Sequence, residues 1–107
     1  MGIEVTGDTF EKEVVLSEVP VLVDFWGPQC GPCLALMPQV EELAGRYGSA
    51  LKLAKVDASK NRRFCLKMKV LGLPTFLVYK DGQELNRIKG DNLTIDEIEA
   101  MVKAVTG

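Results

Sequence analysis

The segment that decides the fold runs from Val21 to Cys33 and reads VLVDFWGPQCGPC. Its first half, Val21–Trp26, is β-branched, aliphatic or aromatic at all but one position, which is typical of a strand buried on both faces. A loop is expected next, and the segment Cys30–Cys33 is expected to begin a helix. A helix start stabilises a thiolate, because its unpaired N–H groups and its dipole attract negative charge.

Two chemistries use cysteines at the spacing of Cys30-Gly31-Pro32-Cys33, namely zinc ligation and thiol–disulfide exchange. Zinc needs four ligands, and the sequence has no histidine and only Cys65 as a further cysteine, so metal is the weaker interpretation. The spacing favours exchange, with Cys30 as attacking nucleophile and Cys33 as resolving thiol one turn along. A pairing of Cys30 with Cys65 stays open, since it depends on how the fold arranges distant segments.

Hydrophobic periodicity and turn residues predict the remaining elements. The expected helices run from a capping box at Asp8–Glu11 to about Ser17, from the cysteine motif to Gly45 and Gly48, over Arg62–Lys69, and onward from Thr94 or Asp96. The expected strands are Leu51–Val56, parallel to the first strand, and a hairpin of Thr75–Tyr79 and Glu84–Lys89 that turns at Asp81-Gly82. Together these elements predict an α/β domain with a mixed sheet.

Length and composition limit the classes of protein to consider. The 107 residues, 47% apolar and 26% charged, suffice for one compact core, so one domain over residues 1–107 is expected. The net charge of −2 predicts no basic surface for phosphates and hence no nucleic-acid partner. The N-terminus lacks a basic start and a long apolar run, so we expect no export signal, no membrane contact and a cytoplasmic location.

Several features stand in one order along almost the whole chain: Val21–Trp26, Cys30–Cys33, Pro38, Lys55, Leu73-Pro74-Thr75 and Gly90. With these features the chain resembles the thioredoxin family. The resemblance implies a single domain with a central mixed β-sheet flanked by helices on both faces. It also implies a protein-disulfide reductase that acts on target proteins through Cys30 and Cys33.

The resemblance assigns further roles around the cysteines. The Leu73–Pro74 bond is expected to be cis and to expose the Leu73 backbone to an extended substrate segment, whereas a trans proline would merely open a strand. Asp24 lies in an apolar strand, so its pKa should be raised, and it is the candidate proton acceptor for Cys33. Lys55 resembles the family lysine that approaches this aspartate. The alternative is that Asp24 points to solvent or simply pairs with Lys55.

A flat apolar surface around the nucleophile is implied to bind substrate. It is expected to comprise Trp26, Gly31, Pro32, Gly72, Leu73, Pro74 and Gly90. Small residues there would let the backbone of a partner approach closely. Ordinary loop geometry for the glycines and core packing for Trp26 are the plain alternatives.

Three positions near the cysteines depart from the family pattern. Gln29 stands where tryptophan is usual, Leu34 where Lys or Arg is common, and Asp91 on a rim that is commonly apolar. We expect altered partner choice and an altered redox poise, with neutral drift as the alternative. Cys65 is expected to be a small core residue, with a regulatory or dimer-forming thiol as the alternative.

The resemblance also implies the partners. Electrons would come from a thioredoxin reductase, either NADPH- or ferredoxin-dependent, and pass to target proteins with disulfides. No bound cofactor is expected, because the cysteines carry the electrons, and the chain is expected to be a monomer. An oxidant or isomerase on the same fold, and a non-catalytic binding subunit, remain the alternatives.

Overall fold

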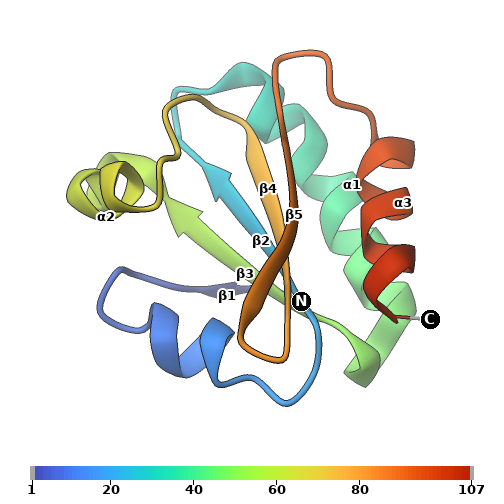
Figure 1. Ribbon diagram of the computed structural model, residues 1–107. Coiled ribbons are helices and arrows are strands. Elements are labelled where there is room, and N and C mark those ends of the chain that lie inside the picture. Colours follow the sequence, from blue (N-terminus) through green and yellow to red (C-terminus); the bar gives the residue numbers. More distant parts are fainter. Residues whose placement is uncertain (1, 107) are drawn as a thin grey trace.

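The computed structural model describes residues 2–106, which form a five-stranded mixed sheet in the order β1-β3-β2-β4-β5 (Figure 1). The strands are β1 (Ile3–Glu4), β2 (Val21–Trp26), β3 (Lys52–Asp57), β4 (Thr75–Lys80) and β5 (Gln83–Lys89). The helices are α1 (Gly31–Tyr47), α2 (Arg62–Lys67) and α3 (Ile95–Thr106), and the short helical turns are η1 (Glu11–Val15), η2 (Gly48–Ala50) and η3 (Ala58–Lys60). The predicted α/β fold is confirmed.

The strand predicted from its continuous apolar residues is the centre of the sheet. β2 pairs parallel to β3 and antiparallel to β4. Val21, Leu22, Val23 and Phe25 are 0% exposed, because helices cover both faces of this strand. β1 pairs parallel to β3 at the sheet edge and was not predicted, since two residues carry no readable periodicity.

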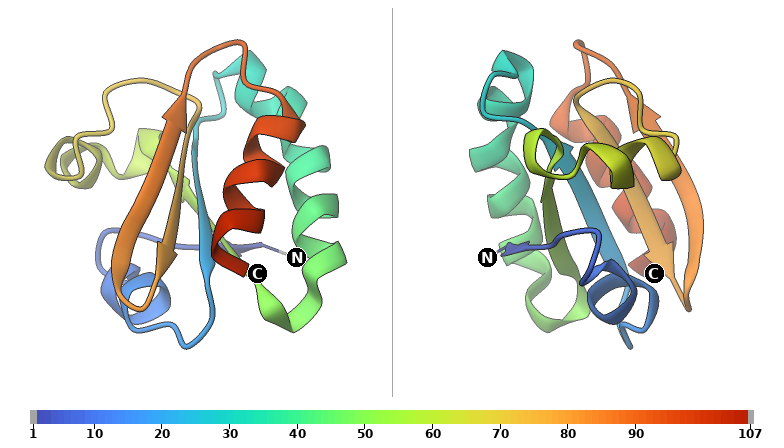
Figure 2. Two further views of the ribbon diagram at one scale, coloured as in Figure 1. Left: turned by 45° about the vertical axis from the view of Figure 1, so that its right-hand side comes forward. Right: turned by 90° about the vertical axis from the view of Figure 1, so that its left-hand side faces the viewer.

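Helices cover both faces of the sheet (Figure 2), and each face carries its own apolar layer. α1 and α3 pack on one face, where the cluster includes Leu22, Val40 and Ile98. η1 and α2 pack on the other, where the cluster includes Val23 and Cys65. Since side chains alternate along a strand, β2 contributes even-numbered residues to the first layer and odd-numbered residues to the second.

A helix start and a hairpin turn formed where the sequence predicts them. α3 begins after Thr94, whose Oγ1 accepts the Glu97 N–H at 3.3 Å, while the Glu97 carboxylate accepts the Thr94 N–H at 2.9 Å. The hairpin turns at Asp81 and Gly82, whose φ angles of 54° and 81° suit a type I′ turn. Both features depend on residues only a few positions apart.

The expected first helix is wrong in its start and its length. A single wide turn, η1, forms instead, and it ends with the Leu16 N–H donating to the Glu11 carbonyl at 2.9 Å. Asp8 caps nothing there: the Thr6 N–H donates to Thr9 Oγ1 at 2.9 Å, and the Asp8 N–H donates to Thr6 Oγ1 at 3.2 Å. Threonine hydroxyls therefore organise a local turn that competes with the predicted cap.

The helix that follows the cysteines continues past Gly45, one of the two glycines that were expected to end it. α1 runs through Gly45 and ends at Gly48, whose φ of 55° is readily adopted by glycine. Pro38 lies within α1. Gly45 therefore occupies a helical position, and only Gly48 ends the helix.

Candidate active site

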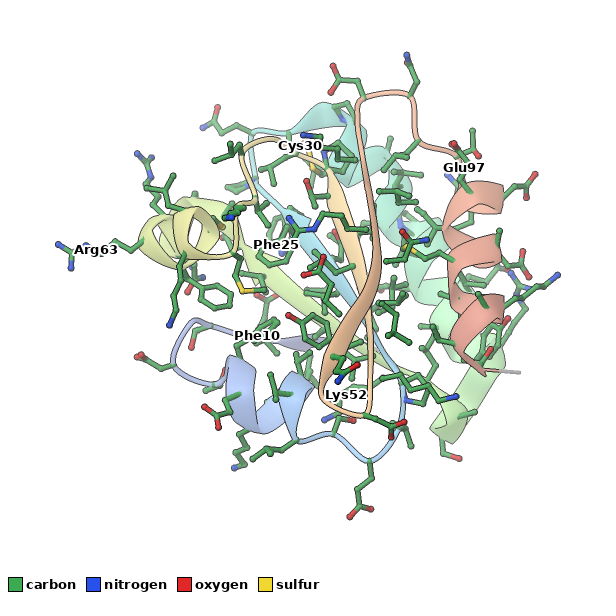
Figure 3. All side chains as sticks on the ribbon, viewed as in Figure 1. Phe10, Phe25, Cys30, Lys52, Arg63 and Glu97 are labelled. Atoms are coloured by element: carbon green, nitrogen blue, oxygen red, sulfur yellow. A yellow bond between two sulfur atoms is a disulfide. The ribbon has the colours of Figure 1, made fainter. Side chains whose placement is uncertain are left out.

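Cys30 lies at the start of α1, after the loop that follows the central strand (Figure 3), and Cys33 lies in the first turn of α1. Cys30 and Cys33 form a disulfide with their Cα atoms 5.3 Å apart. Cys30 is the N-cap residue, and its Sγ accepts the Cys33 backbone N–H at 3.2 Å. Cys33 is 2% exposed, whereas Cys30 is half-buried. The sulfur of Cys30 is thus the accessible one of the pair.

The third cysteine belongs to the core and not to this disulfide. Cys65 lies in α2 with a free, buried thiol, packed in the layer of η1 and α2. Burial and the charge of Asp57 raise the pKa of this thiol, so it is poorly ionised at neutral pH. The alternative pairing of Cys30 with Cys65 is therefore wrong, and the core role predicted for Cys65 agrees with its burial.

Asp24 is a buried carboxyl group in the middle of β2. It is 1% exposed, and its Oδ1 has no hydrogen-bond partner among the described residues. Burial raises the pKa of Asp24 from 3.8 to about 7, against the opposing charge of Lys55 and with help from Glu4 and Glu41. Asp24 does not point to solvent, so that alternative is wrong.

Lys55 has a different ion-pair partner from the one considered from the sequence. Its Nζ lies 2.7 Å from Glu41 Oε2, and Glu41 belongs to α1. Lys55 is opposite Asp24 in the parallel register of β2 and β3, and its charge lowers the pKa of Asp24. Because side chains on adjacent strands at the same level share a face, Asp24, Lys55 and Glu41 form one charged group between the sheet and α1.

Asp24 faces the helix that carries the cysteines. Leu22, two residues earlier on β2, packs with Leu36 and Val40 of α1. Alternation along the strand places Asp24 on the same face as Leu22 and closer to the strand end that leads to Cys30. The carboxyl group therefore lies under the first turns of α1.

The loop before β4 forms the facing side of the site. The Leu73–Pro74 bond is cis, as predicted. Thr75 Oγ1 donates to the Gly72 carbonyl at 2.6 Å, and the Gly90 N–H donates to the Pro74 carbonyl at 3.2 Å. Gly90 has a φ of 128°, a backbone conformation that side chains disfavour.

Leu73 lines two surface hollows that border the predicted site. The first, of about 340 Å³, is lined by Gly27, Pro28, Gln29, Cys30, Ala58, Ser59 and Leu73. The second, of about 380 Å³, is lined by Leu71, Gly72, Leu73, Lys89, Gly90 and Asp91. The structure thus brings Cys30, Gly72, Leu73 and Gly90 to one surface.

The other predicted surface residues occupy different positions. Gly31 and Pro32 form the first turn of α1, and Pro74 is buried. Trp26 is half-buried at the end of β2 and lines neither hollow, and its indole Nε1 has no hydrogen-bond partner in the described part of the chain. Trp26 therefore combines packing with partial exposure.

Sequence reasoning missed Ala58 and Ser59, which line the hollow beside Cys30. A signal was available, because β2 and β3 are parallel and their carboxyl ends meet at one edge of the sheet. The residues after each strand therefore lie near one another. Of the three unusual positions, Gln29 and Asp91 line the two hollows and Leu34 is 46% exposed on α1, so all three are accessible.

Comparison with known proteins gives one consistent result. The thioredoxin family model matches residues 2–104. A thioredoxin of Acetoanaerobium sticklandii is 47% identical over 100 residues, which cover 94% of this chain and 95% of that protein. A thioredoxin of Peptoclostridium acidaminophilum is 41% identical over 105 residues, covering 98% and 96%, and thioredoxin 1 of a Nostoc species is 40% identical over 87 residues, covering 81% of each.

An α/β fold that places a redox-active cysteine pair at the start of a helix defines a thiol–disulfide oxidoreductase. Within that class of enzymes, this chain belongs to the thioredoxin family. The family, the fold and the enzyme class predicted from the sequence are confirmed. Among residues 2–106, no helix is both long and apolar enough to cross a membrane.

Proposed function

We propose that this protein reduces disulfides of target proteins, with Cys30 as nucleophile and Cys33 as resolving thiol. The observation that carries the proposal is the accessible Cys30 sulfur at the N-cap of α1, with Cys33 buried one turn along. The Cys30 thiolate attacks one target sulfur, a mixed disulfide forms, and the other target sulfur leaves as a thiolate. Cys33 then attacks Cys30, the Cys30–Cys33 bond forms, and the second target thiolate leaves. Two electrons pass to the target, whose thiolates take up protons.

Asp24 is proposed to accept the proton that Cys33 loses in the second step. A pKa of about 7 keeps this carboxyl group partly ionised at neutral pH, so it can take up a proton there. Its place under the first turns of α1 supports the assignment. Lys55 is proposed to favour the ionised form of Asp24, because its charge lowers the pKa of that group.

The proposed substrate surface consists of Trp26, Gly31, Pro32, Gly72, Leu73, Pro74 and Gly90. Openness around its glycines supports this role. A Cβ atom added at Gly31, Gly72 or Gly90 would meet no other atom within 4 Å, so the backbone of a target can approach these positions. Leu73, which lines both hollows, is proposed to pair with an extended target segment.

The wider setting follows from the family. We propose that residues 1–107 form one thioredoxin domain that works as a cytoplasmic monomer. Electrons would enter from a thioredoxin reductase, NADPH- or ferredoxin-dependent, and leave to disulfide-containing proteins. The two cysteines hold both electrons between these steps, so the cycle requires no bound cofactor.

The equilibrium reduction potential of the Cys30/Cys33 pair tests the direction of the reaction. Leu34 provides no cation near the pair, and a thiolate without a nearby cation makes the reduced form less stable. We therefore expect a potential below that of the glutathione pool, measured against a dithiothreitol buffer. A potential well above that pool would contradict reduction and assign the same site to oxidation or isomerisation.

A matched variant shows whether the flanking residue sets this potential. Leu34 is exposed on the first turn of α1, so Leu34→Lys adds a cation without disturbing the core. The added charge stabilises the thiolate, and we expect the potential to rise by about 10–30 mV, where 30 mV corresponds to about 1.4 kcal/mol. Leu34→Gln is the uncharged control. An equal rise in both variants would remove charge as the cause.

A further inference from the structure

The segment around α2 holds a concentration of positive charge. Five exposed cations lie within ten residues: Lys60, Arg62, Arg63, Lys67 and Lys69. No acidic residue occurs between Asp57 and Asp81, and Asp57 is buried. The other eight Lys and Arg share the rest of the chain with the remaining acidic residues, so the net charge of −2 conceals a basic surface. The prediction from the net charge that the protein has no basic surface is therefore wrong.

Ion pairs within residues 2–106 of the protein do not account for these charges. None of the five belongs to an ion pair among the described residues. Arg62 and Arg63 occupy the first turn of α2, where the helix dipole favours acids, and Arg63 repels Lys67 one turn along. Asp8 and Glu11 line surface hollows with parts of this segment without pairing with it. The cations are thus available to an external partner.

The helix itself is firmly held. Arg87 of β5 donates to the carbonyls of Met68 and Lys69, each at 3.1 Å. The Val70 N–H donates to the Cys65 carbonyl at 2.8 Å, which closes the end of α2. The cations therefore project from an anchored element, and Figure 3 shows Arg63 extending away from the sheet.

An apolar hollow connects this charge to the redox site. It measures about 350 Å³ and is lined by Arg62 and by Leu66 and Leu71, which are 66% and 76% exposed. It shares Ala58 and Leu73 with the hollow beside Cys30. A chain bound at Cys30 can continue along this surface toward α2.

We propose that the α2 face, defined as Lys60, Arg62, Arg63, Leu66, Lys67, Lys69 and Leu71, docks an acidic segment of the target protein beside its reducible disulfide. The proposal rests on the proposed function of the cysteine pair, and it names the class of target. Charge complementarity selects Asp- or Glu-rich sequences with an apolar side chain for the hollow. A second copy of the same face would be repelled by its like charge.

Three matched peptides test this proposal. Each contains the same intramolecular disulfide and one leucine, followed by a run of Glu, Gln or Lys. Reduction by the dithiol form of the protein is followed as kcat/KM at low and high salt. We expect the Glu peptide to react about 10-fold faster than the Lys peptide at low salt, because opposite charge raises the association rate. The difference should shrink at high salt, where charges are screened.

Two triple variants with the same change in net charge locate the effect. Arg62→Glu, Arg63→Glu and Lys67→Glu should invert the preference. The acids added at positions 62 and 63 lie in the first turn of α2, where they suit the helix dipole. Lys12→Glu, Lys80→Glu and Lys103→Glu change three exposed cations outside the α2 face and should retain the preference. An equal loss in both triples, or no preference in the unmodified protein, would overturn the proposal.

The remaining outcomes separate docking from chemistry. If all three peptides stay oxidised, the proposed function fails, and docking is then decided by adding a cysteine-free Glu peptide and recording amide NMR shifts. Shifts confined to residues 60–71 support the α2 face, and their absence overturns it. A single-stranded oligonucleotide that binds there more tightly than the Glu peptide would overturn the proposal in favour of a nucleic-acid partner.

Discussion

α3 begins at Thr94, whose hydroxyl accepts the Glu97 N–H, whereas α1 begins at Cys30, whose sulfur accepts the Cys33 N–H. The first turn of α3 contains acidic residues that suit the helix dipole, and the first turn of α1 contains none. Both starts leave unpaired N–H groups to be satisfied. At α3 an oxygen cap satisfies them, and at α1 a reactive sulfur occupies the same place.

The difference shows how one helix position can serve either stability or reactivity. An oxygen acceptor with acidic neighbours holds a helix end in place. A sulfur at this position shares the same N–H groups and dipole, which stabilise its thiolate. Because no acidic side chain lies at the start of α1, the N–H groups and the helix dipole there can stabilise the Cys30 thiolate.

The largest effect is expected from Cys30→Ser, which keeps a capping acceptor and removes the nucleophile. Disulfide exchange should fall by at least about 10³-fold, as for loss of other catalytic nucleophiles. The unfolding free energy should stay close to that of the reduced protein, whereas Cys30→Ala should lose about 1 kcal/mol with the cap. Turnover of peptide disulfides and urea unfolding in reductant measure both. Retained turnover in Cys30→Ser would transfer the nucleophilic role to Cys33.

Asp24→Asn removes the carboxyl group under the start of α1. Exchange near neutral pH should slow by about 10-fold or more, because the resolving thiol loses its proton acceptor. The rate of the unmodified protein should rise with the ionisation of Asp24 near pH 7, and the variant should lose this rise. Rapid-mixing rates across pH measure it. Identical pH profiles would exclude Asp24 from the mechanism.

Asp24→Asn also changes how the unfolding free energy depends on pH. Because the pKa of Asp24 is raised to about 7 in the folded protein, the folded state keeps a proton that the unfolded state releases near 3.8. The contribution of Asp24 to the unfolding free energy is therefore greatest below about pH 3.8 and falls by about 4 kcal/mol as the pH rises to about 7. Asp24→Asn should lack this fall, as urea unfolding at about pH 4 and about pH 8 would show.

Thr94→Ala affects the start of α3 alone. Loss of the cap should cost about 1 kcal/mol of unfolding free energy, and Thr94→Ser should restore most of it. The reduction potential and exchange rate should not change, since the capping contacts of Thr94 stay within the start of α3 and Thr94 lines neither hollow of the site. A shifted potential in this variant would show that the two helix starts are coupled.

The smallest effect is expected from Glu41→Gln on α1. Glu41 raises the pKa of Asp24 and holds Lys55 in an ion pair, so its replacement should lower that pKa. A carbon-13 NMR titration of the Asp24 carboxyl group measures the change. Glu42→Gln, at the neighbouring exposed position, is the control and should leave the pKa of Asp24 unchanged.

The elements predicted correctly depend on residues close together in the sequence. Val21–Trp26 reads as a buried strand, Asp81-Gly82 as a hairpin turn, and Thr94 as one of two possible helix starts, because these signals act over a few residues. The start and the length of the first helix were wrong because hydroxyl groups nearby offered a competing local arrangement. Local patterns are decisive where no nearby side chain competes for the same backbone groups.

The sequence by itself determined the fold class, the central strand and the cysteine pair at the start of a helix. Only the tertiary structure decided that Lys55 pairs with Glu41 and that the hollow lined by Leu66 and Leu71 links the α2 cations to the redox site. The physical reason is the distance along the sequence over which each interaction acts. Backbone periodicity and capping act between near neighbours, whereas ion pairs, burial and hollows depend on which distant segments pack together.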